Sequence, residues 1–536
     1  MKQIFTDLFP SLTRKRSFFS TLLTVCAVLM TAFAVNARGS EGTSAPLGLR
    51  ERIDKLFPPP LDATTSASVE RGGLRLPVRP EQLPEQPFKF VVPRVEQRLL
   101  SNGTKIFSYS APQALGFYAV AIIEAGSVCD PPEKLGLAEV TALAMRSGGA
   151  GSYSSDELDR QLDRLGASLA VDVQRDYVRF TLFCLPEKAP ESLQLLRFIL
   201  IAPRFEVAAV QREKALFKER LVRVEDDPAE LSRREFRKVV YGTTHPLART
   251  PRISDVDRLS REDVRAFYKK YYGPWSTRIG IAALDPKSCT GDKIQLFEQW
   301  HVPGQKPTVN RGTVPADLSP AFQGLYVLPK EIEQVYIRMG HIGRPRDPND
   351  QPVVDVLNNV FGTGGLTSRL MQKVRTEYGL AYAVGGGVFE DNPAGVFAAV
   401  GSTKAQSAAD ALSIMRQVIE ELAKVPPTKE ELETAKRDAM FAFSSRFASP
   451  QETLVQYMLA DLYGYPPDYL SNYMARVEQV TAHDVHAAAQ RYVRSEKLAV
   501  LVLGRETVTE SLSKKFGKVT PWQQPKSSES AKQRKR

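Results

Sequence analysis

The chain repeats part of its own sequence pattern, and this repeat constrains the fold more than any other feature. Asp263-Val264, Tyr271 and the apolar run 279–282 form a pattern that recurs 221 residues later (484 − 263 = 221). The later copies are Asp484-Val485, Tyr492 and 500–503. Self-similarity at a fixed offset predicts two copies of one structural unit.

Two other matches support the repeat. Residues 210–214 match 432–436 at an offset of 222, and 117–120 match 335–338 at an offset of 218. The offsets differ by only a few residues, as expected when two related domains differ by small insertions in loops.

The repeat predicts homologous domains over 94–290 and 318–510, joined by a Pro- and Gly-containing linker over 291–317. Each half mixes strand-like segments, rich in β-branched and aromatic residues, with long segments of helical periodicity. We therefore expect an α+β fold in which each half is a mainly antiparallel sheet covered by helices on one face. The predicted strands of the first half are 107–110, 117–124, 169–173 and 177–183.

The first 37 residues have the pattern of an export signal. A basic stretch at 14–16 precedes the apolar run 18–34, and the small residues of Val35-Asn36-Ala37 suit a cleavage site. This predicts export to the periplasm. The run nearly reaches the length of a membrane-spanning helix, so an uncleaved signal would instead anchor the protein to the membrane.

Two segments outside the repeat have the composition of linkers and tails. Residues 38–93 are Pro-rich and polar, which predicts an extended leader. Residues 511–536 are expected to form a basic, disordered tail.

The composition limits the chemistry available to the chain. Histidine is the commonest zinc ligand in proteins, and the chain has only five. There is no C-x-x-C pair, so a cysteine zinc site is not supported. The net charge of +11, spread over 536 residues, is a mild excess that does not indicate a nucleic-acid partner. The histidines are His245, His301, His341, His483 and His486.

His483 and His486 are three residues apart and could share a helical face. Their counterparts in the first half are Glu262 and Arg265, which are both polar. A solvent-facing helix surface therefore explains this pair better than a metal site does.

One stretch of the second half is distinctive. A Gly-rich turn at 364–365 is followed by a predicted helix from about Thr367, with Arg375 in its last turn. Gly379 suits the left-handed position that ends a helix, and Tyr382 would begin the next strand. Arg375 and Tyr382 could thus border one cleft.

The pattern formed by 368–370, Arg375 and 379–382 resembles the insulinase and pitrilysin family of zinc peptidases, which includes the mitochondrial processing peptidase. The resemblance extends over about 94–510. It implies that the Arg and the Tyr hold substrate and stabilise the reaction centre, with further substrate contacts at Gly364, Gly365, Ser368 and Arg369. Without the resemblance, Arg375 would be read as an exposed charge at a helix end, and Tyr382 as a core residue.

The zinc motif that this family carries in its first half is degenerate here. Active members have Gly-Leu-Ala-His-x-x-Glu-His, in which two histidines bind zinc and the Glu activates water. This chain has Glu139 in place of the first His, Ala142 in place of the catalytic Glu and Leu143 in place of the second His. The family's third ligand falls at Arg220, with Glu219 one residue away. The resemblance therefore implies that this chain binds no zinc.

Loss of the zinc motif and retention of the Arg/Tyr pair predict a non-catalytic subunit. In this family, some enzymes are heterodimers in which one chain carries zinc and the other supplies that pair. The expected partners are a homologue with an intact H-x-x-E-H motif, which would carry the zinc, and a peptide substrate. Two alternatives remain: a scaffold or peptide-binding protein without a catalytic partner, and a self-sufficient zinc peptidase.

Overall fold

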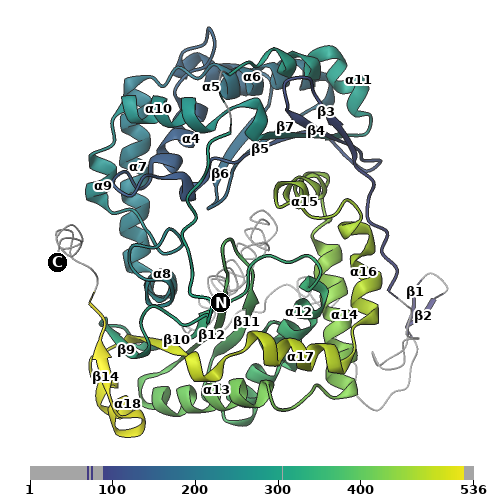
Figure 1. Ribbon diagram of the computed structural model, residues 1–536. Helices are drawn as coiled ribbons and strands as arrows, with labels where there is room; N and C mark the ends of the chain where they lie inside the picture. Colours follow the sequence, from purple (N-terminus) through teal and green to yellow (C-terminus); the bar gives the residue numbers. More distant parts are fainter. Residues whose placement is uncertain (1–68, 72–73, 77–87, 303, 305, 524–536) are drawn as a thin grey trace, which may run out of the picture. The chain divides into compact units, whose positions relative to one another are not determined.

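The computed structural model describes the folded part of the chain (Figure 1), namely residues 69–71, 74–76, 88–302, 304 and 306–523. The predicted signal peptide at 1–37 lies outside the described residues. Within the predicted leader, β1 (Val69–Arg71) and β2 (Leu74–Leu76) pair as an antiparallel hairpin.

The first half forms a six-stranded sheet in the order β3-β4-β8-β5-β7-β6. Only β4 and β8 run parallel; the other neighbours are antiparallel. Helices pack on one face around a large apolar core. The strands are β3 (Glu96–Leu99), β4 (Lys105–Ser110), β5 (Phe117–Ile123), β6 (Ser168–Val173), β7 (Val178–Cys184) and β8 (Thr277–Ala283). The helices are α4 (Leu137–Ser147), α5 (Ser155–Arg164), α6 (Ala189–Ile201), α7 (Val207–Asp226), α8 (Pro228–Tyr241), α9 (Ile253–Asp257), α10 (Arg261–Tyr271) and α11 (Pro286–Thr290).

The second half forms a second six-stranded sheet in the order β14-β9-β13-β10-β12-β11. Each strand occupies the position of its counterpart in the first sheet. Only the edge strand β14 differs in origin, because it comes from the end of the described chain whereas β3 begins the first half. The strands are β9 (Gly324–Pro329), β10 (Gln334–Ile342), β11 (Ala383–Phe389), β12 (Val396–Lys404), β13 (Ala499–Gly504) and β14 (Val519–Pro521). The helices are α12 (Gln351–Asn358), α13 (Ala408–Leu422), α14 (Lys429–Ser445), α15 (Pro450–Leu462), α16 (Tyr469–Gln479), α17 (Ala482–Tyr492) and α18 (Val508–Phe516).

The strand registers confirm the repeat found in the sequence. Tyr118 lies opposite Ala282 between β5 and β8, and Tyr336 lies opposite Leu503 between β10 and β13. These pairs are related by the offsets 218 (336 − 118) and 221 (503 − 282). The predicted α+β architecture with two homologous halves is therefore confirmed.

The expected disordered tail is wrong for its first part, residues 511–523. Val508 and Leu512, four residues apart, are buried on one side of α18, and β14 extends the second sheet. Trp522 is 7% exposed, and its ring packs edge-on against Phe322 and Tyr326 at 5.3 Å each. The high proportion of Lys and Ser around these few apolar residues conceals the element in the sequence. Residues 524–536 lie outside the described residues.

The region predicted as the linker begins inside the first core. The 3₁₀ helix η6 (Gly291–Gln299) places Phe297 and then Trp300 in the apolar cluster of the first half. Further along, Arg311 forms an ion pair with Asp176 in the turn between β6 and β7. The connection is thus held against the first half on its way to β9.

Each half packs one helix on the sheet of the other half, so that two helices are exchanged (Figure 1). Helix α15 of the second half packs on β4, β5 and β8, and α8 of the first half packs on β10 and β13. Leu454, Val455 and Met458 of α15 are each at most 3% exposed and form a closed apolar cluster with strand residues. Those strand residues are Phe107, Val120, Ile122 and Ala282.

Charged groups fix the orientation of α15 on the first sheet. The Asp461 carboxylate accepts hydrogen bonds from Arg278 Nε at 2.6 Å and from Lys105 Nζ at 2.7 Å. Arg278 also donates to Glu124 at 2.9 Å. Burial alone would raise the pKa of Asp461, but Lys105 and Arg278 hold it below its ordinary value. Asp461 is therefore ionised and bound at neutral pH.

No helix in the described ranges combines the length and the apolar character needed to cross a bilayer.

Gly280 of β8 allows α15 to approach closely, which leads to a stability prediction. A Cβ at this position would lie 2.8 Å from the Met458 sulfur and 3.2 Å from Leu454. We expect Gly280→Ala to lower the free energy of unfolding by about 1–3 kcal/mol through overpacking. Urea titration of Gly280→Ala, Met458→Ala and the double variant measures this. Relief of the clash should make the double variant less unstable than the sum of the single changes, and strict additivity would contradict the contact.

Candidate functional site

The helix that carries the degenerate zinc motif, α4, has a precisely capped start. Gly136 precedes it with φ +90°, in the left-handed region. The Asp130 carboxylate accepts hydrogen bonds from the backbone N–H groups of Gly136 and Ala138, at 2.7 Å each. Burial raises the pKa of Asp130 to about 7, against the opposing effect of these bonds. Glu139, Ala142 and Leu143 therefore sit on an ordered helix.

An ion pair joins two of the positions that the resemblance assigns to zinc ligands. Glu139 on α4 and Arg220 on α7 approach to 2.7 Å, and the Arg220 guanidinium lies 5.2 Å from the centre of the Phe217 ring. Glu219 instead points away, with a 64% exposed side chain near Arg223. The structure thus places Arg220, and not Glu219, opposite the motif.

These residues do not fit a zinc ion. Ala142 is fully buried, Leu143 is partly buried, and neither has a ligand atom. Arg220 is a permanent cation and already neutralises Glu139. Across the described residues, no three His, Cys, Asp or Glu side chains gather in a way that could hold a metal. No catalytic step through zinc can therefore be assigned to this half.

The histidines of the second half have other roles. His341 in β10 is fully buried, and the Arg494 backbone N–H donates to its Nε2 at 2.9 Å. Its Nδ1 must then carry the proton and donate to Ile342 O at 2.7 Å. His483 is 89% exposed, which agrees with the predicted helix surface, and His486 Nε2 lies 3.1 Å from Ala423 O.

Arg375 and Tyr382 lie together on an exposed part of the second half. The helix that carries Arg375 is widened to a π-helix over Met371–Glu377 (η9), a rare form that is frequent at functional sites. Gly379 ends it at φ +62°, as predicted from the sequence. The Arg375 guanidinium is 5.9 Å from the centre of the Tyr382 ring, and Tyr382 is 51% exposed. The pair is available to a ligand.

The neighbouring residues of the motif are engaged within the chain. Gly365 has φ +60°, and the buried Ser368 hydroxyl donates to its carbonyl at 2.9 Å. Arg369 forms a two-point ion pair with Glu431, with both N–O distances at 2.8 Å. It also donates to the carbonyls of Val425 and Pro426. Ser368 and Arg369 therefore hold the turn and helix in place.

Sequence reasoning missed the role of Glu431 in this motif. Its spacing from Thr428 predicts a capping box for α14, and the structure confirms that box. The same carboxylate also anchors Arg369, 62 residues earlier in the chain. No local pattern connects the two residues, so only the fold reveals this pair.

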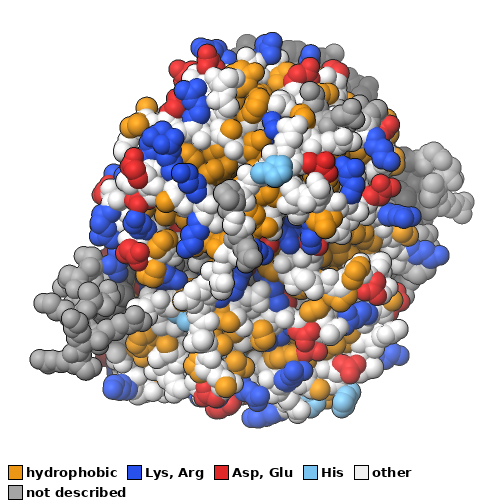
Figure 2. All heavy atoms as spheres, turned by 45° about the horizontal axis from the view of Figure 1, so that its top comes forward, with side chains coloured by type: hydrophobic (Ala, Val, Ile, Leu, Met, Phe, Trp, Pro, Cys, Tyr) orange, Lys and Arg blue, Asp and Glu red, His pale blue; other side chains and the backbone are white. Residues whose placement is uncertain are grey.

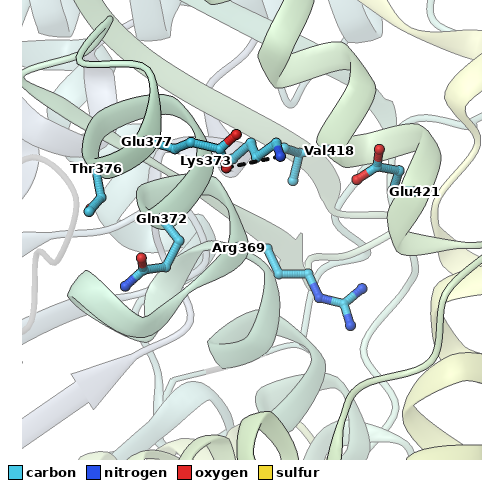
Figure 3. A pocket seen from close by; sticks show the side chains of 7 residues that line it. All are labelled: Arg369, Gln372, Lys373, Thr376, Glu377, Val418 and Glu421. Carbon is cyan, nitrogen blue, oxygen red and sulfur yellow. Dashed lines mark ion pairs between the residues drawn. The ribbon is translucent and has the colours of Figure 1, made fainter.

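A surface pocket of about 250 Å³ lies between η9 and α13 (Figure 3). In its wall, Lys373 Nζ and Glu377 Oε2 form an ion pair at 2.9 Å, and Arg369 and Glu421 also line the pocket. Arg375 is not among the lining residues. The pocket is therefore distinct from the Arg375–Tyr382 pair.

Positive and negative side chains are interspersed over the face shown in Figure 2. The excess of positive charge is therefore not gathered into one continuous basic patch on that face.

Known families match both halves of the chain. Residues 106–249 match the family described as insulinase (peptidase family M16), and residues 258–438 match the peptidase M16 inactive domain. The chain belongs to peptidase family M16. The matched ranges include all four degenerate motif positions as well as Arg375 and Tyr382.

Several curated bacterial M16 relatives resemble the chain at low identity. A Mycobacterium tuberculosis protein described as an uncharacterized zinc protease is 23% identical over 364 residues, covering 67% of this chain and 82% of the relative. A Bacillus subtilis protein described as the uncharacterized zinc protease YmxG is 24% identical over 348 residues, covering 64% of this chain and 82% of the relative. A Helicobacter pylori relative described as the non-peptidase homolog YmxG is 23% identical over 333 residues, covering 60% and 73%.

Solved structures share the fold. A peptidase M16 inactive domain from Pseudomonas fluorescens superposes with a TM-score of 0.69 at 24% identity, covering 77% of this chain and 98% of that one. A protease from Helicobacter pylori has the same TM-score at 19% identity, covering 77% and 100%. The two-sheet architecture is therefore that of M16 proteins.

The ion pair at the motif predicts how zinc binding could be restored. We expect the wild-type chain to retain no stoichiometric zinc, because Arg220 occupies a ligand position. The combined change Glu139→His, Ala142→Glu, Leu143→His and Arg220→Glu rebuilds three ligands and the base, and should bind about one zinc per chain. Elemental analysis after dialysis measures the zinc content of the wild type and of the variant. The variant that keeps Arg220 serves as the control, and stoichiometric zinc in the wild type would contradict the interpretation.

Burial of His341 predicts a loss of stability in mild acid. Burial lowers the pKa of its imidazole to about 4, below the ordinary value of 6.5. The unfolded chain therefore takes up the proton first, and the contribution to stability, complete above pH 6.5, is lost as the pH falls towards 4. Between pH 7 and pH 5 we expect a loss of about 2 kcal/mol from this group. Urea unfolding at both pH values should show this loss in the wild type and a smaller one in His341→Gln; equal losses would contradict it.

Proposed function

We propose that this chain is the non-catalytic subunit of an exported zinc metallopeptidase. It pairs with an M16 homologue that carries an intact H-x-x-E-H motif, and it contributes Arg375, Tyr382 and peptide-contacting surface. One contrast supports the proposal above all. The former metal position is closed by the Glu139–Arg220 ion pair, whereas Arg375 and Tyr382 remain exposed and in contact.

The exposed pair offers two donor side chains to a peptide. The Arg375 guanidinium is always charged and presents several N–H donors, and the Tyr382 hydroxyl adds one more. Such donors bind a peptide carbonyl and stabilise the negative charge that develops on its oxygen during hydrolysis. The partner supplies the zinc that activates water. This chain positions the peptide and stabilises charge.

Export is part of the proposal. The basic stretch, apolar run and small residues of the first 37 positions suit a signal sequence, which supports a periplasmic location for the complex. An uncleaved signal would hold the same complex at the membrane surface.

A second candidate function is a scaffold or peptide-binding protein that has no catalytic partner. It is favoured by the relative described as a non-peptidase homolog and by the match to the M16 inactive domain. In that case the exposed Arg375–Tyr382 pair would bind peptide without any hydrolysis.

The shared site predicts a specific loss of activity. The full chain is co-expressed with each H-x-x-E-H family member of the same genome, and the purified complex is assayed on a fluorogenic peptide. We expect Arg375→Ala and Tyr382→Phe each to lower kcat/KM by roughly 100-fold, because each removes a donor to developing charge. Both side chains are exposed, so assembly should be unchanged by size-exclusion chromatography.

Matched controls come from the same helix and its end. Lys373→Ala removes a cation and Tyr378→Phe removes a hydroxyl, both outside the proposed contact, and each should retain activity. Full activity of the Arg375 and Tyr382 variants would refute the shared site. A complex that binds peptide and never hydrolyses it would favour the scaffold.

A further inference from the structure

Three leucines lie together at one end of the first sheet. Phe117 of β5 is opposite Cys184 of β7, and Ser110 of β4 is opposite Ala283 of β8. Leu185 and Leu284 directly follow Cys184 and Ala283, and Leu115 precedes Phe117 by two residues. Since β8, β5 and β7 are consecutive strands, spaced by about 4.8 Å, the three leucines form one group. We call it the leucine end.

The leucine end is exposed although its residues are apolar. The exposed fractions are 91% for Leu115, 50% for Leu185 and 65% for Leu284. Beside them, the Tyr118 and Phe183 rings lie 5.0 Å apart and are only partly buried. A contiguous exposed apolar group of this kind marks an interaction surface more often than scattered single residues do.

The second half provides an internal comparison. The paired registers relate Leu115 to Glu333, Leu185 to Lys404 and Leu284 to Arg505. All three counterparts are exposed and charged. The same fold therefore accepts charges at these positions, and the leucines are not needed to build the sheet end.

The leucine end lies just beyond the contact between α15 and the first sheet. Tyr118 packs beside the cluster that α15 forms with the first sheet. The leucines continue from the end of this sheet face into exposed loops. The leucine end thus follows directly, along the strands, from the sheet face that binds α15.

Charges around the leucines favour a self-complementary contact. Leu185 is followed by Glu187 and Lys188, and Leu284 by Asp285 and Lys287. All four charged residues are exposed. Each loop thus offers one acid and one base, and a two-fold axis would bring the acids of one copy to the bases of the other. An anionic membrane would instead favour a net positive rim.

We propose that the leucine end is a contact between two copies of this chain, related by a two-fold axis. The leucines form the apolar centre, and the Glu187–Lys188 and Asp285–Lys287 loops form the polar rim, as in other protein interfaces. This contact lies in the first half and does not require the proposed peptidase partner. It would join two subunits, or two complete complexes, while Arg375 and Tyr382 in the second half stay free.

The experiment replaces each leucine with its own counterpart from the second half. The wild-type protein, expressed as the full chain and purified from the cell, is compared with the triple variant Leu115→Glu, Leu185→Lys, Leu284→Arg. Light scattering after size-exclusion chromatography measures mass from about 1 to about 100 µM, where modest interfaces dissociate. We expect a dimer at the upper concentrations for the wild type and a monomer throughout for the variant.

A matched control changes three exposed apolar residues elsewhere. Val207→Glu, Val222→Lys and Val425→Arg, at positions 61%, 48% and 51% exposed, should leave the dimer intact. A wild type that stays monomeric, or a triple variant that still dimerises, would overturn the proposal. Flotation with phosphatidylcholine–phosphatidylglycerol vesicles tests whether the leucines bind an anionic lipid surface instead. A monomer that binds vesicles through the leucines would show that they meet lipid and not a second copy.

Discussion

The exchange of helices between the two halves is the contact on which the rest of the structure depends. Helix α15 covers the free face of the first sheet, and α8 covers that of the second. Neither sheet could leave that apolar face in water, so neither half is complete without the other. Asp461, held by Arg278 and Lys105, fixes the first contact. The buried Glu235 of α8, bound by Lys238 and by the Trp522 indole N–H, fixes the second.

The packing around the motif helix does not depend on a bound metal. The motif helix α4 lies in the apolar core of the first half, is capped by Asp130 and contacts α7 directly. The Glu139–Arg220 pair joins α4 to α7, but its Arg side chain is 46% exposed, so it contributes only about 0–1 kcal/mol. Stability resides in the apolar core and the exchanged helices.

The sequence predicted the features that repeat or have local signatures. The offsets 218 and 221 relate paired strand residues of the first sheet to those of the second. Gly379, with its left-handed backbone, ends the helix that carries Arg375, as predicted. The exchanged helices could not be foreseen, because amphipathic periodicity shows that a helix buries one face and not which sheet it meets. The same limit concealed the Arg369–Glu431 pair, whose partners lie 62 (431 − 369) residues apart. Only the resemblance, and no periodicity, brought Arg220 together with Glu139, 81 (220 − 139) residues earlier.

We propose that this chain completes the site of a zinc-bearing homologue and holds no zinc itself. The most direct measurement is a titration, in which increasing amounts of this chain are added to a fixed amount of the homologue and peptide hydrolysis is followed. The account predicts that neither protein is fully active alone, and that the rate rises and saturates at one chain per homologue. A homologue whose rate this chain does not change, or hydrolysis by this chain alone that a chelator abolishes, would contradict it.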